Sequence, residues 1–414
     1  MADPVPLLQI IHISDQHVQK GLGDRAGLAN NNRRFQSWLR EKLEWHDAFE
    51  WHEGTLGHDE TAASAFEQFL QQLRKKDKIW FNSQVSGPET WLVDTGDATA
   101  FGDFDSIRTA HELRSRWESI LNPCKVRSLF GNHDAWPSTH PAILAGASYA
   151  PAMAKQRMQL RQRPDWHKEE WLKPLATMGG EPLPRIECYG LSTVSFGLLD
   201  NILAIGEIEE NDLAELKQQI LNQSHNPAYR ILLTHHPLVF PYLPSEKKVK
   251  GLIDKMTLRN ADSVVGQLLN ASPSVPSSTR SPYIHLVLSG HTHLAYPGNA
   301  LPCNVKDLYQ GSLGRAQAQL VNGSMMLLRS RKAISGTAKN CNDPCREILP
   351  DFPGASVFDA SQQFQILRFF FDQSQPDGLI LQRIIMARVP NDKRGYAALK
   401  PLSSTTFVPH SDSI

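Results

Sequence analysis

The sequence predicts an α/β fold, because short apolar runs alternate with amphipathic segments and each run ends in polar residues able to bind a metal. The clearest runs span residues 7–13, 91–93, 231–233 and 284–288, and a weaker one spans 126–130. Short runs with β-branched residues are typical of buried strands. Open α/β sheets place their sites just beyond the carboxyl ends of such strands. We therefore expect a functional site where these runs end.

Three segments between these runs have the periodicity of amphipathic helices. Apolar residues recur at helical spacing in 62–73, 106–121 and 211–222. The first segment ends in Arg-Lys-Lys at 74–76, which suits the C-terminus of a helix. The sequence therefore predicts helices between the strands.

Two stretches are interpreted as insertions into this core. Residues 18–60 are rich in Trp, His and Arg, and residues 135–185 contain several prolines amid short helical pieces. Residues 272–282 are rich in Ser and Pro, so we expect an exposed loop there.

The C-terminal part predicts a β-hairpin followed by a tail. Apolar runs at 364–371 and 379–389 flank the polar sequence Asp-Gln-Ser-Gln-Pro-Asp-Gly, which is typical of a hairpin with a longer loop. We expect one domain over residues 1–390 and a tail over residues 391–414, frayed in its last dozen residues.

Composition predicts a globular protein of the cytoplasm. The chain is 41% hydrophobic and 21% charged, and its 43 basic residues balance 43 acidic ones, which gives no sign of a general nucleic-acid surface. Its cysteines are few and scattered, unlike a disulfide framework. The spacing of Cys341 and Cys345 occurs in some metal sites, but no second pair lies nearby, so we expect a plain loop with two free thiols. The N-terminus lacks the pattern of a signal peptide, and no long apolar stretch predicts a membrane span.

The polar clusters at the strand ends predict a metal site. Asp15 and His17 are two residues apart, so in an extended chain they point to the same side and can grip one metal. A carboxylate such as Asp97 has two oxygens and can bridge two cations. The candidate ligands are Asp15, His17, Asp97, Asn132, His235, His291 and His293. This nitrogen and oxygen set without thiolate suits Mn²⁺, Fe or Zn²⁺.

These motifs resemble those of the calcineurin-like metallophosphoesterases. The family pattern is Asp-x-His, Gly-Asp, Gly-Asn-His-Asp or Glu, a His, and Gly-His-x-His, and here it lies at 15–17, 96–97, 131–134, 235 and 290–293. The likeness covers residues 7 to about 320. It implies a four-layer α/β/β/α sandwich, with two central sheets between helices and the metals at one edge.

The resemblance also implies how two divalent metal ions are held. One ion takes Asp15, His17, Asp97 and His293, and the other takes Asp97, Asn132, His235 and His291, so that Asp97 bridges them. At Thr-His-His-Pro the family's ligand is the first histidine, His235. The second, His236, is left a supporting or structural role.

The paired cations predict hydrolysis by attack of a metal-bridging hydroxide. The leaving alkoxide then needs a proton, and His133 matches the acid proposed for the family. Asp134 is expected to hold His133 in the right tautomer and raise its pKa. The alternative for Asp134 is a carboxylate that only caps its loop.

The leading hypothesis is a phosphodiesterase acting on a small molecule, with 3′,5′-cyclic nucleotides as candidates, because the motifs resemble bacterial members of the family, some of which cleave them. A DNA nuclease and a phosphomonoesterase or protein phosphatase are the enzymatic alternatives, and the neutral charge argues against the nuclease. A metal-free scaffold of the same fold ranks last, because such scaffolds lose ligands and no ligand is missing here.

Overall fold

In the computed structural model of the chain, the first strand lies inside a six-stranded sheet with the order β10-β9-β8-β1-β2-β3. The structure describes residues 4–16, 18, 60–81, 87–99, 104–135, 185–194, 205–222, 228–238, 258–269, 284, 286–291, 319–322, 362–372, 378–388 and 396–407. Strand β1 (Val5–Ile13) runs parallel to β2 (Glu89–Asp94), which pairs in parallel with β3 (Lys125–Ser128). The predicted runs at 7–13, 91–93 and 126–130 therefore form neighbouring strands.

The other half of this sheet is antiparallel. Strand β8 (Gln362–Asp372) pairs with β1, and β9 (Gly378–Arg388) pairs with β8 from Gln362↔Arg388 to Asp372↔Gly378. This pairing is the one that the predicted hairpin requires, and its connection at 373–377 lies outside the described residues. Strand β10 (Tyr396–Phe407) pairs with β9 in the segment for which the sequence predicts only a tail.

The second sheet has four parallel strands in the order β4-β5-β6-β7. Strands β5 (Ala228–Leu233) and β6 (Leu286–Ser289) correspond to predicted runs. Strands β4 (Arg185–Gly190) and β7 (Gln319–Asn322) are not predicted from the sequence. The fold is therefore mixed α/β with parallel strand pairs in both sheets, as predicted.

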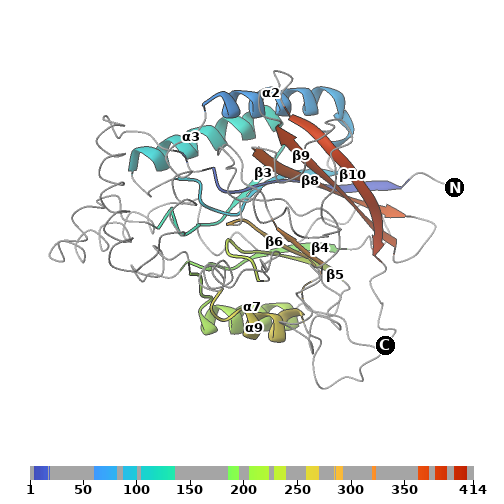
Figure 1. Cartoon of the computed structure of the whole chain (residues 1–414). Coiled ribbons are helices and arrows are strands. Elements are labelled where there is room, and N and C mark those ends of the chain that lie inside the picture. The colour runs from blue at the N-terminus through green and yellow to red at the C-terminus, as the bar shows by residue number, and fades with distance from the viewer. Residues whose placement is uncertain are drawn as a thin grey trace, which may run out of the picture.

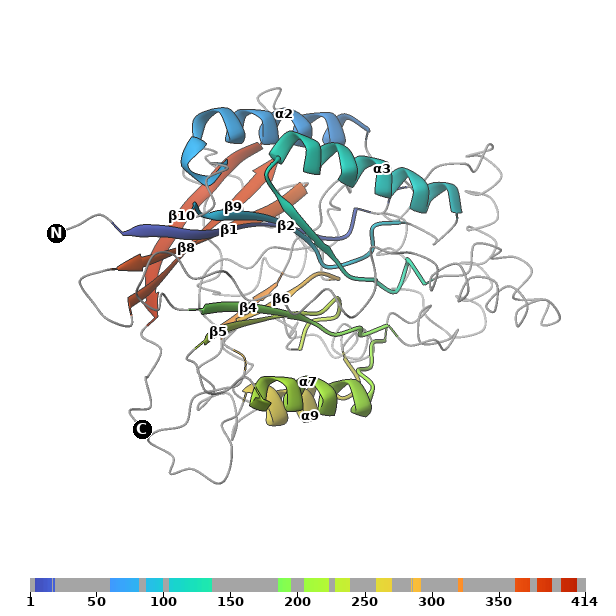
Figure 2. The same cartoon turned by 180° about the vertical axis from the view of Figure 1, so that it is seen from behind.

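Helices lie on the outer sides of the two sheets (Figures 1 and 2). Helices α2 (Glu60–Lys76) and α3 (Phe104–Leu121) lie beside the first sheet, and the short 3-10 helix η2 (Lys78–Phe81) follows α2 on the way to β2. Helix α7 (Glu210–Asn222) and the short helical segments α9 (Ala261–Val264) and η5 (Val265–Leu269) lie below the second sheet in Figure 1. The three predicted helices are confirmed.

Aromatic side chains join the outer helices to the first sheet. The ring of Phe66 on α2 meets Trp117 of α3 edge-on at 5.1 Å and Phe364 of β8 at 4.9 Å. All three side chains are fully buried. Edge-to-face contacts at such distances add to the hydrophobic stabilisation of the core.

A second apolar cluster lies between the sheets. Leu8 and Ile10 of β1 pack in one cluster with Ile231 and Leu233 of β5 and Leu286 of β6. Each strand alternates its side chains between two faces, and nearly every residue of β1 is buried. The central strands are thus covered on both faces, and their polar ends meet at one edge.

Several predicted features fall outside the described residues. They are the loop at 272–282, Cys341, Cys345 and nearly all of the two insertions. Within the described part of the chain, no helix is long and apolar enough to span a membrane.

Candidate metal centre

The centre forms where the carboxyl ends of four strands meet. Asp15 follows β1, Asp97 follows β2, His235 follows β5 and His291 follows β6. Main-chain hydrogen bonds join these ends, from Asp15 N to the Gly96 carbonyl at 2.8 Å and from Gly290 N to the His235 carbonyl at 3.0 Å. The carboxyl ends of the strands therefore lie close together, as expected for a site of an open α/β sheet.

The carboxylate of Asp15 connects the two sheets. It accepts hydrogen bonds from the main-chain N–H of His291, at 3.1 Å to Oδ1 and 2.9 Å to Oδ2. Asp15 is fully buried and His291 is 5% exposed, so the contact is shielded from water. The end of β1 is thus bonded to the main chain at His291, directly after β6.

Three residues of the centre have left-handed backbone conformations. The φ angles are 57° at Asp15, 54° at Asp97 and 70° at His291, and these are the positive-φ residues other than glycine in the described part of the chain. Such a conformation costs about 1–3 kcal/mol per residue and persists where the surroundings enforce it, often at functional sites. The strain here coincides with three of the predicted ligands.

Three polar atoms converge beside His235. Its Nε2 lies 3.1 Å from Oδ1 of Asn132 and 3.3 Å from Oδ2 of Asp97, and all three residues are buried. Its Nδ1 lies 2.9 Å from the Thr95 carbonyl, an acceptor, so Nδ1 carries the proton. In the neutral ring, Nε2 therefore carries a lone pair and no proton. It faces two oxygens that are hydrogen-bond acceptors as well. A cation fits this set of acceptors.

The pKa of His235 also indicates that a positive charge is favoured at this place. Burial alone would lower its pKa, but the carboxylates of Asp97 and Asp15 raise the pKa to about 9. In the absence of metal, a proton therefore occupies the place where the acceptors converge. Asp15, Asp97 and His235 also offer ligand atoms within 4.8 Å of one another. The geometry and the electrostatics are both those of a site that could hold a cation.

His133 and Asp134 lie beside this set. The main-chain N–H of His133 donates to Oδ1 of Asp97 at 2.8 Å, and its side chain is nearly buried. His133 is thereby held next to Asn132, at the edge of the candidate ligands. Its role as an acid stays a prediction.

Asp134 ties two loops together. Its carboxylate accepts hydrogen bonds from Gly131 N at 3.0 Å, Ala98 N at 3.2 Å, and the N and Oγ1 of Thr99 at 2.8 and 2.9 Å. Burial and the nearby charge of Asp97 raise its pKa despite these donors. These contacts correspond to the loop-capping alternative, and the role expected toward His133 stays a prediction.

Asp94 supports the centre although the sequence assigns it no role. Its carboxylate accepts hydrogen bonds from Gln16 Nε2 at 2.7 Å and Gly96 N at 3.1 Å, and Arg114 lies 3.7 Å away. Asp94 thus fixes the turn that carries Asp97. The Asp-Thr-Gly-Asp motif is the sequence feature that could have pointed to Asp94. The motif alone, however, does not reveal that Gln16, Gly96 and Arg114 surround its carboxylate.

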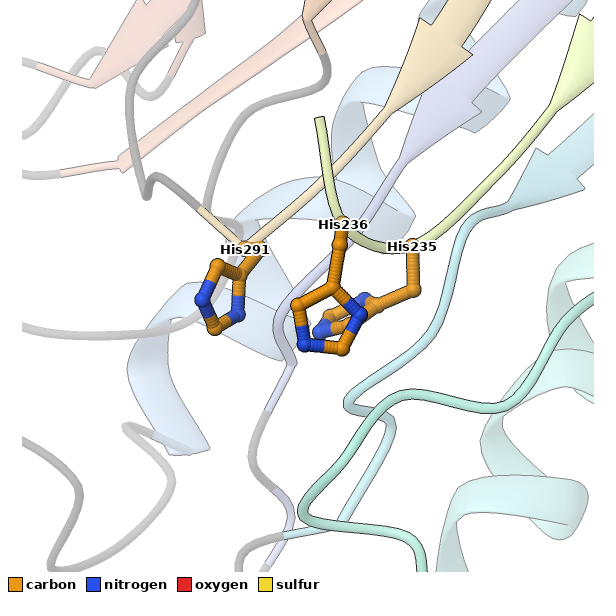
Figure 3. A group of neighbouring side chains, drawn as sticks. All are labelled: His235, His236 and His291. Atoms are coloured by element: carbon orange, nitrogen blue, oxygen red, sulfur yellow. The ribbon is translucent and has the colours of Figure 1, made fainter. Parts of the chain in front are cut away.

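A second group of possible ligands lies at the ends of β5 and β6. His235, His236 and His291 are buried and offer ligand atoms within 4.8 Å of one another. Figure 3 shows the three rings gathered together, two from the end of β5 and one from the end of β6. His17 and His293 lie outside the described residues, so their ligand roles stay predictions.

Comparison with known proteins identifies one family. The calcineurin-like phosphoesterase family matches residues 8–295. No curated protein matches the chain. Among solved structures, a dimetal phosphatase from Danio rerio is 12% identical with a TM-score of 0.38, over 96% of this chain and 100% of that one. GAP50, titled the anchor in the inner membrane complex of Plasmodium, is 8% identical with a TM-score of 0.41, over 98% of this chain and 89% of that one. At these TM-scores neither likeness supports a conclusion.

Proposed function

Because the chain belongs to the calcineurin-like phosphoesterase family, we propose that it hydrolyses small phosphodiesters, with 3′,5′-cyclic nucleotides as the first substrates to test. Metal-dependent hydrolysis of phosphoesters follows from the family. The observation that carries the proposal is the meeting of His235 Nε2 with the oxygens of Asn132 and Asp97 at 3.1 and 3.3 Å. Three buried acceptors in one place favour a bound cation over a metal-free scaffold.

Two cations would share the carboxylate of Asp97. One would be held by Asp97, Asn132, His235 and His291, and the other by Asp97 with Asp15, His17 and His293. Nitrogen and oxygen ligands of this kind suit Mn²⁺, Fe or Zn²⁺. When bound, the cations supply an activated water and neutralise charge on the phosphoryl group.

The chain itself would supply the proton for the leaving group. An alkoxide is a poor leaving group, so a positioned acid speeds its departure. His133 is suited to this role, because its main-chain N–H donates to Oδ1 of Asp97 at 2.8 Å and it directly follows Asn132 in the sequence. Asp97 would thus position the acid as well as the cations.

A panel of phosphoesters with Mn²⁺ added tests the proposal. The panel contains 3′,5′-cyclic nucleotides, bis-p-nitrophenyl phosphate, p-nitrophenyl phosphate and single-stranded DNA. We expect turnover of the first two to exceed that of the monoester and of DNA. A preference for p-nitrophenyl phosphate would identify a phosphomonoesterase instead, and degradation of DNA would identify a nuclease.

Variants of acidic residues show whether the measured turnover comes from this metal centre or from a contaminating enzyme. Asp97→Ala is expected to hold fewer than about one metal ion per chain and to lose turnover, because it removes the shared ligand. Asp212→Ala, on helix α7, is the matched control and should keep both. A native chain that binds no metal and cleaves nothing would favour the scaffold.

A further inference from the structure

We propose that His236 is a third imidazole ligand of the metal centre and binds, through Nε2, the same cation as His235 and His291. The inference rests on the metal centre of the proposed function. It adds a ligand at a position to which the sequence assigns only a supporting or structural role.

The hydrogen bonds of His236 are those of a metal ligand. Its Nδ1 lies 2.8 Å from Oγ1 of Thr193, and the same oxygen accepts the main-chain N–H of His236 at 3.1 Å. A hydroxyl oxygen has two lone pairs and can accept both. With the proton on Nδ1, Nε2 presents a lone pair. Metal-bound histidines characteristically donate their other N–H in this way, as His235 does to Thr95.

The Nε2 atom of His236 lacks a hydrogen-bond partner in the described part of the chain, although the side chain is fully buried. A buried polar atom without a partner costs about 1–3 kcal/mol. Neutral imidazole is the form that binds metal. A cation would therefore satisfy this atom.

The three rings lie close enough to share one ion. The ring centroids are 4.5 Å apart for His236 and His291, 5.0 Å for His235 and His236, and 5.1 Å for His235 and His291. Their ligand atoms lie within 4.8 Å of one another. Two nitrogens on opposite sides of an ion, each bound at about 2.1 Å, are about 4.2 Å apart. Small side-chain movements would thus complete the site (Figure 3).

The surrounding backbone holds the His236 ring in place. A Cβ on Gly206 would lie 2.5 Å from Cγ and Nδ1 of the ring, so the main chain passes directly against it. Glu207 N donates to the Thr193 carbonyl at 3.0 Å, which fixes the segment carrying the Thr193 hydroxyl. The ring is therefore positioned from two sides, as a ligand requires.

Three imidazoles on one ion have a consequence for metal choice. Nitrogen-rich sites favour Zn²⁺ and later transition metals over Mn²⁺ and Mg²⁺, which prefer oxygen. The other cation, held by Asp15, His17, Asp97 and His293, would have the same number of oxygen ligands and one imidazole fewer. We expect the two positions to differ in their preferred metal.

Titration of the metal-free full chain with Co²⁺ tests the assignment, with calorimetry for affinity and visible absorption for coordination. In His236→Gln, one of two bound ions is expected to lose at least about 100-fold in affinity, more than loss of an outer partner costs. Its absorption bands should also change. The other ion should bind as in the native chain.

Two further variants serve as comparisons for this result. Thr193→Val removes only the partner of Nδ1 and is expected to lower affinity for the same ion by about 10–100-fold. His111→Gln, on the exposed side of α3, is the matched control and should titrate like the native chain. Thermal unfolding of each metal-free variant shows whether it folds.

The outcomes distinguish failure of the His236 assignment from failure of the proposed function. Two ions bound by His236→Gln with native affinity and spectrum would overturn the ligand and leave the phosphodiesterase standing. A native chain that binds no Co²⁺ would overturn both. If His236→Gln does not fold, anomalous diffraction from crystals of the Zn²⁺-loaded native chain decides. We expect His236 Nε2 at about 2.1 Å from one ion, and a position outside bonding distance of either ion overturns the proposal.

Discussion

Gly131 leaves no room for a side chain beside Asp97. A Cβ on Gly131 would lie 2.0 Å from Oδ1 of Asp97 and 2.3 Å from its main-chain nitrogen. Gly96 meets the same segment, since its Cβ would lie 2.5 Å from Gly131 N. The two Gly-containing motifs therefore approach backbone to backbone, which places Asn132 and His133 against Asp97.

We expect Gly131→Ala to damage both the fold and the metal centre. The added methyl group must displace Asp97 or its loop, because the nearest atoms are main chain and a buried carboxylate. Overpacking of this kind costs about 1–3 kcal/mol, and more where nothing yields. Urea denaturation of the metal-free protein measures the free energy of unfolding, and metal analysis of the loaded protein should show fewer ions per chain than native.

Gly266→Ala is the matched control for this variant. Gly266 lies in the π-helical segment η5, and a Cβ there would meet nothing within 4 Å. Alanine at such a position stabilises by up to about 1 kcal/mol through the unfolded state. Equal effects of the two substitutions would show that the contact with Asp97 is not tight.

His133→Ala should affect catalysis according to the leaving group. General acid catalysis contributes about 10²–10⁴-fold, so an alkyl phosphodiester should lose turnover by that factor. Bis-p-nitrophenyl phosphate, whose leaving group needs no proton, should lose much less. Metal content should stay native, because His133 is not among the expected ligands. Unchanged turnover of the alkyl ester would refute the role of His133 as the acid.

The main lines of the fold and centre follow from local sequence patterns. Strands β1, β2, β5 and β6 are short apolar runs, and parallel neighbours bring their carboxyl ends to one edge. Hence Asp15, Asp97, His235 and His291 could be predicted to meet before their contacts were known. The family likeness added the division of the ligands between two ions.

Contacts between distant segments could not be predicted in the same way. Thr193 and His236 are far apart in sequence, and neither belongs to a pattern that pairs it with the other. The hydrogen bonds from Ala98 and Thr99 to Asp134 depend on the loop approach at Gly131. Such partners emerge only from the packed arrangement of several strand ends.

Strand β10 shows a limit of periodicity. Its sequence contains Pro401 and a run of Ser and Thr, and proline within a run argues against an interior strand. The structure places it at the end of the strand order, paired with β9. Edge strands tolerate such residues because one side of their backbone is not paired within the sheet.

The carboxyl group of Asp94 should make stability depend on pH. Burial raises its pKa to about 7 against the opposing effect of Arg114, whereas an unfolded chain has an Asp pKa of about 3.9. The folded state therefore holds this proton more tightly. The stability that Asp94 contributes is complete below pH of about 4 and is lost as the pH rises through about 7.

Asp94→Asn should remove this dependence. We expect the free energy of unfolding of the metal-free native chain to fall more steeply between pH 5 and 8 than that of the variant, as measured by urea denaturation. Asp212→Asn is the control and should follow the native curve. Parallel curves for native and Asp94→Asn would mean that Asp94 stays ionised beside Arg114.

The Thr95 side chain should matter for stability and its carbonyl for metal binding. Gln365 Nε2 donates to Nδ1 of buried His12 at 2.6 Å, so His12 Nε2 carries the proton that Thr95 Oγ1 accepts at 2.9 Å. Thr95→Val removes this acceptor and should lower the free energy of unfolding by about 1–3 kcal/mol. The carbonyl that orients His235 remains, so metal content should stay native.

Thr95→Ser provides the matched comparison, because it keeps the hydroxyl and loses only a methyl group. Urea denaturation of the metal-free variants should place Thr95→Ser closer to native than Thr95→Val, while metal analysis should not distinguish them. If Thr95→Val instead lost metal without losing stability, the His12 contact would act on His235 and not on the sheet. Both readouts are therefore needed, since the two halves of Thr95 face different partners.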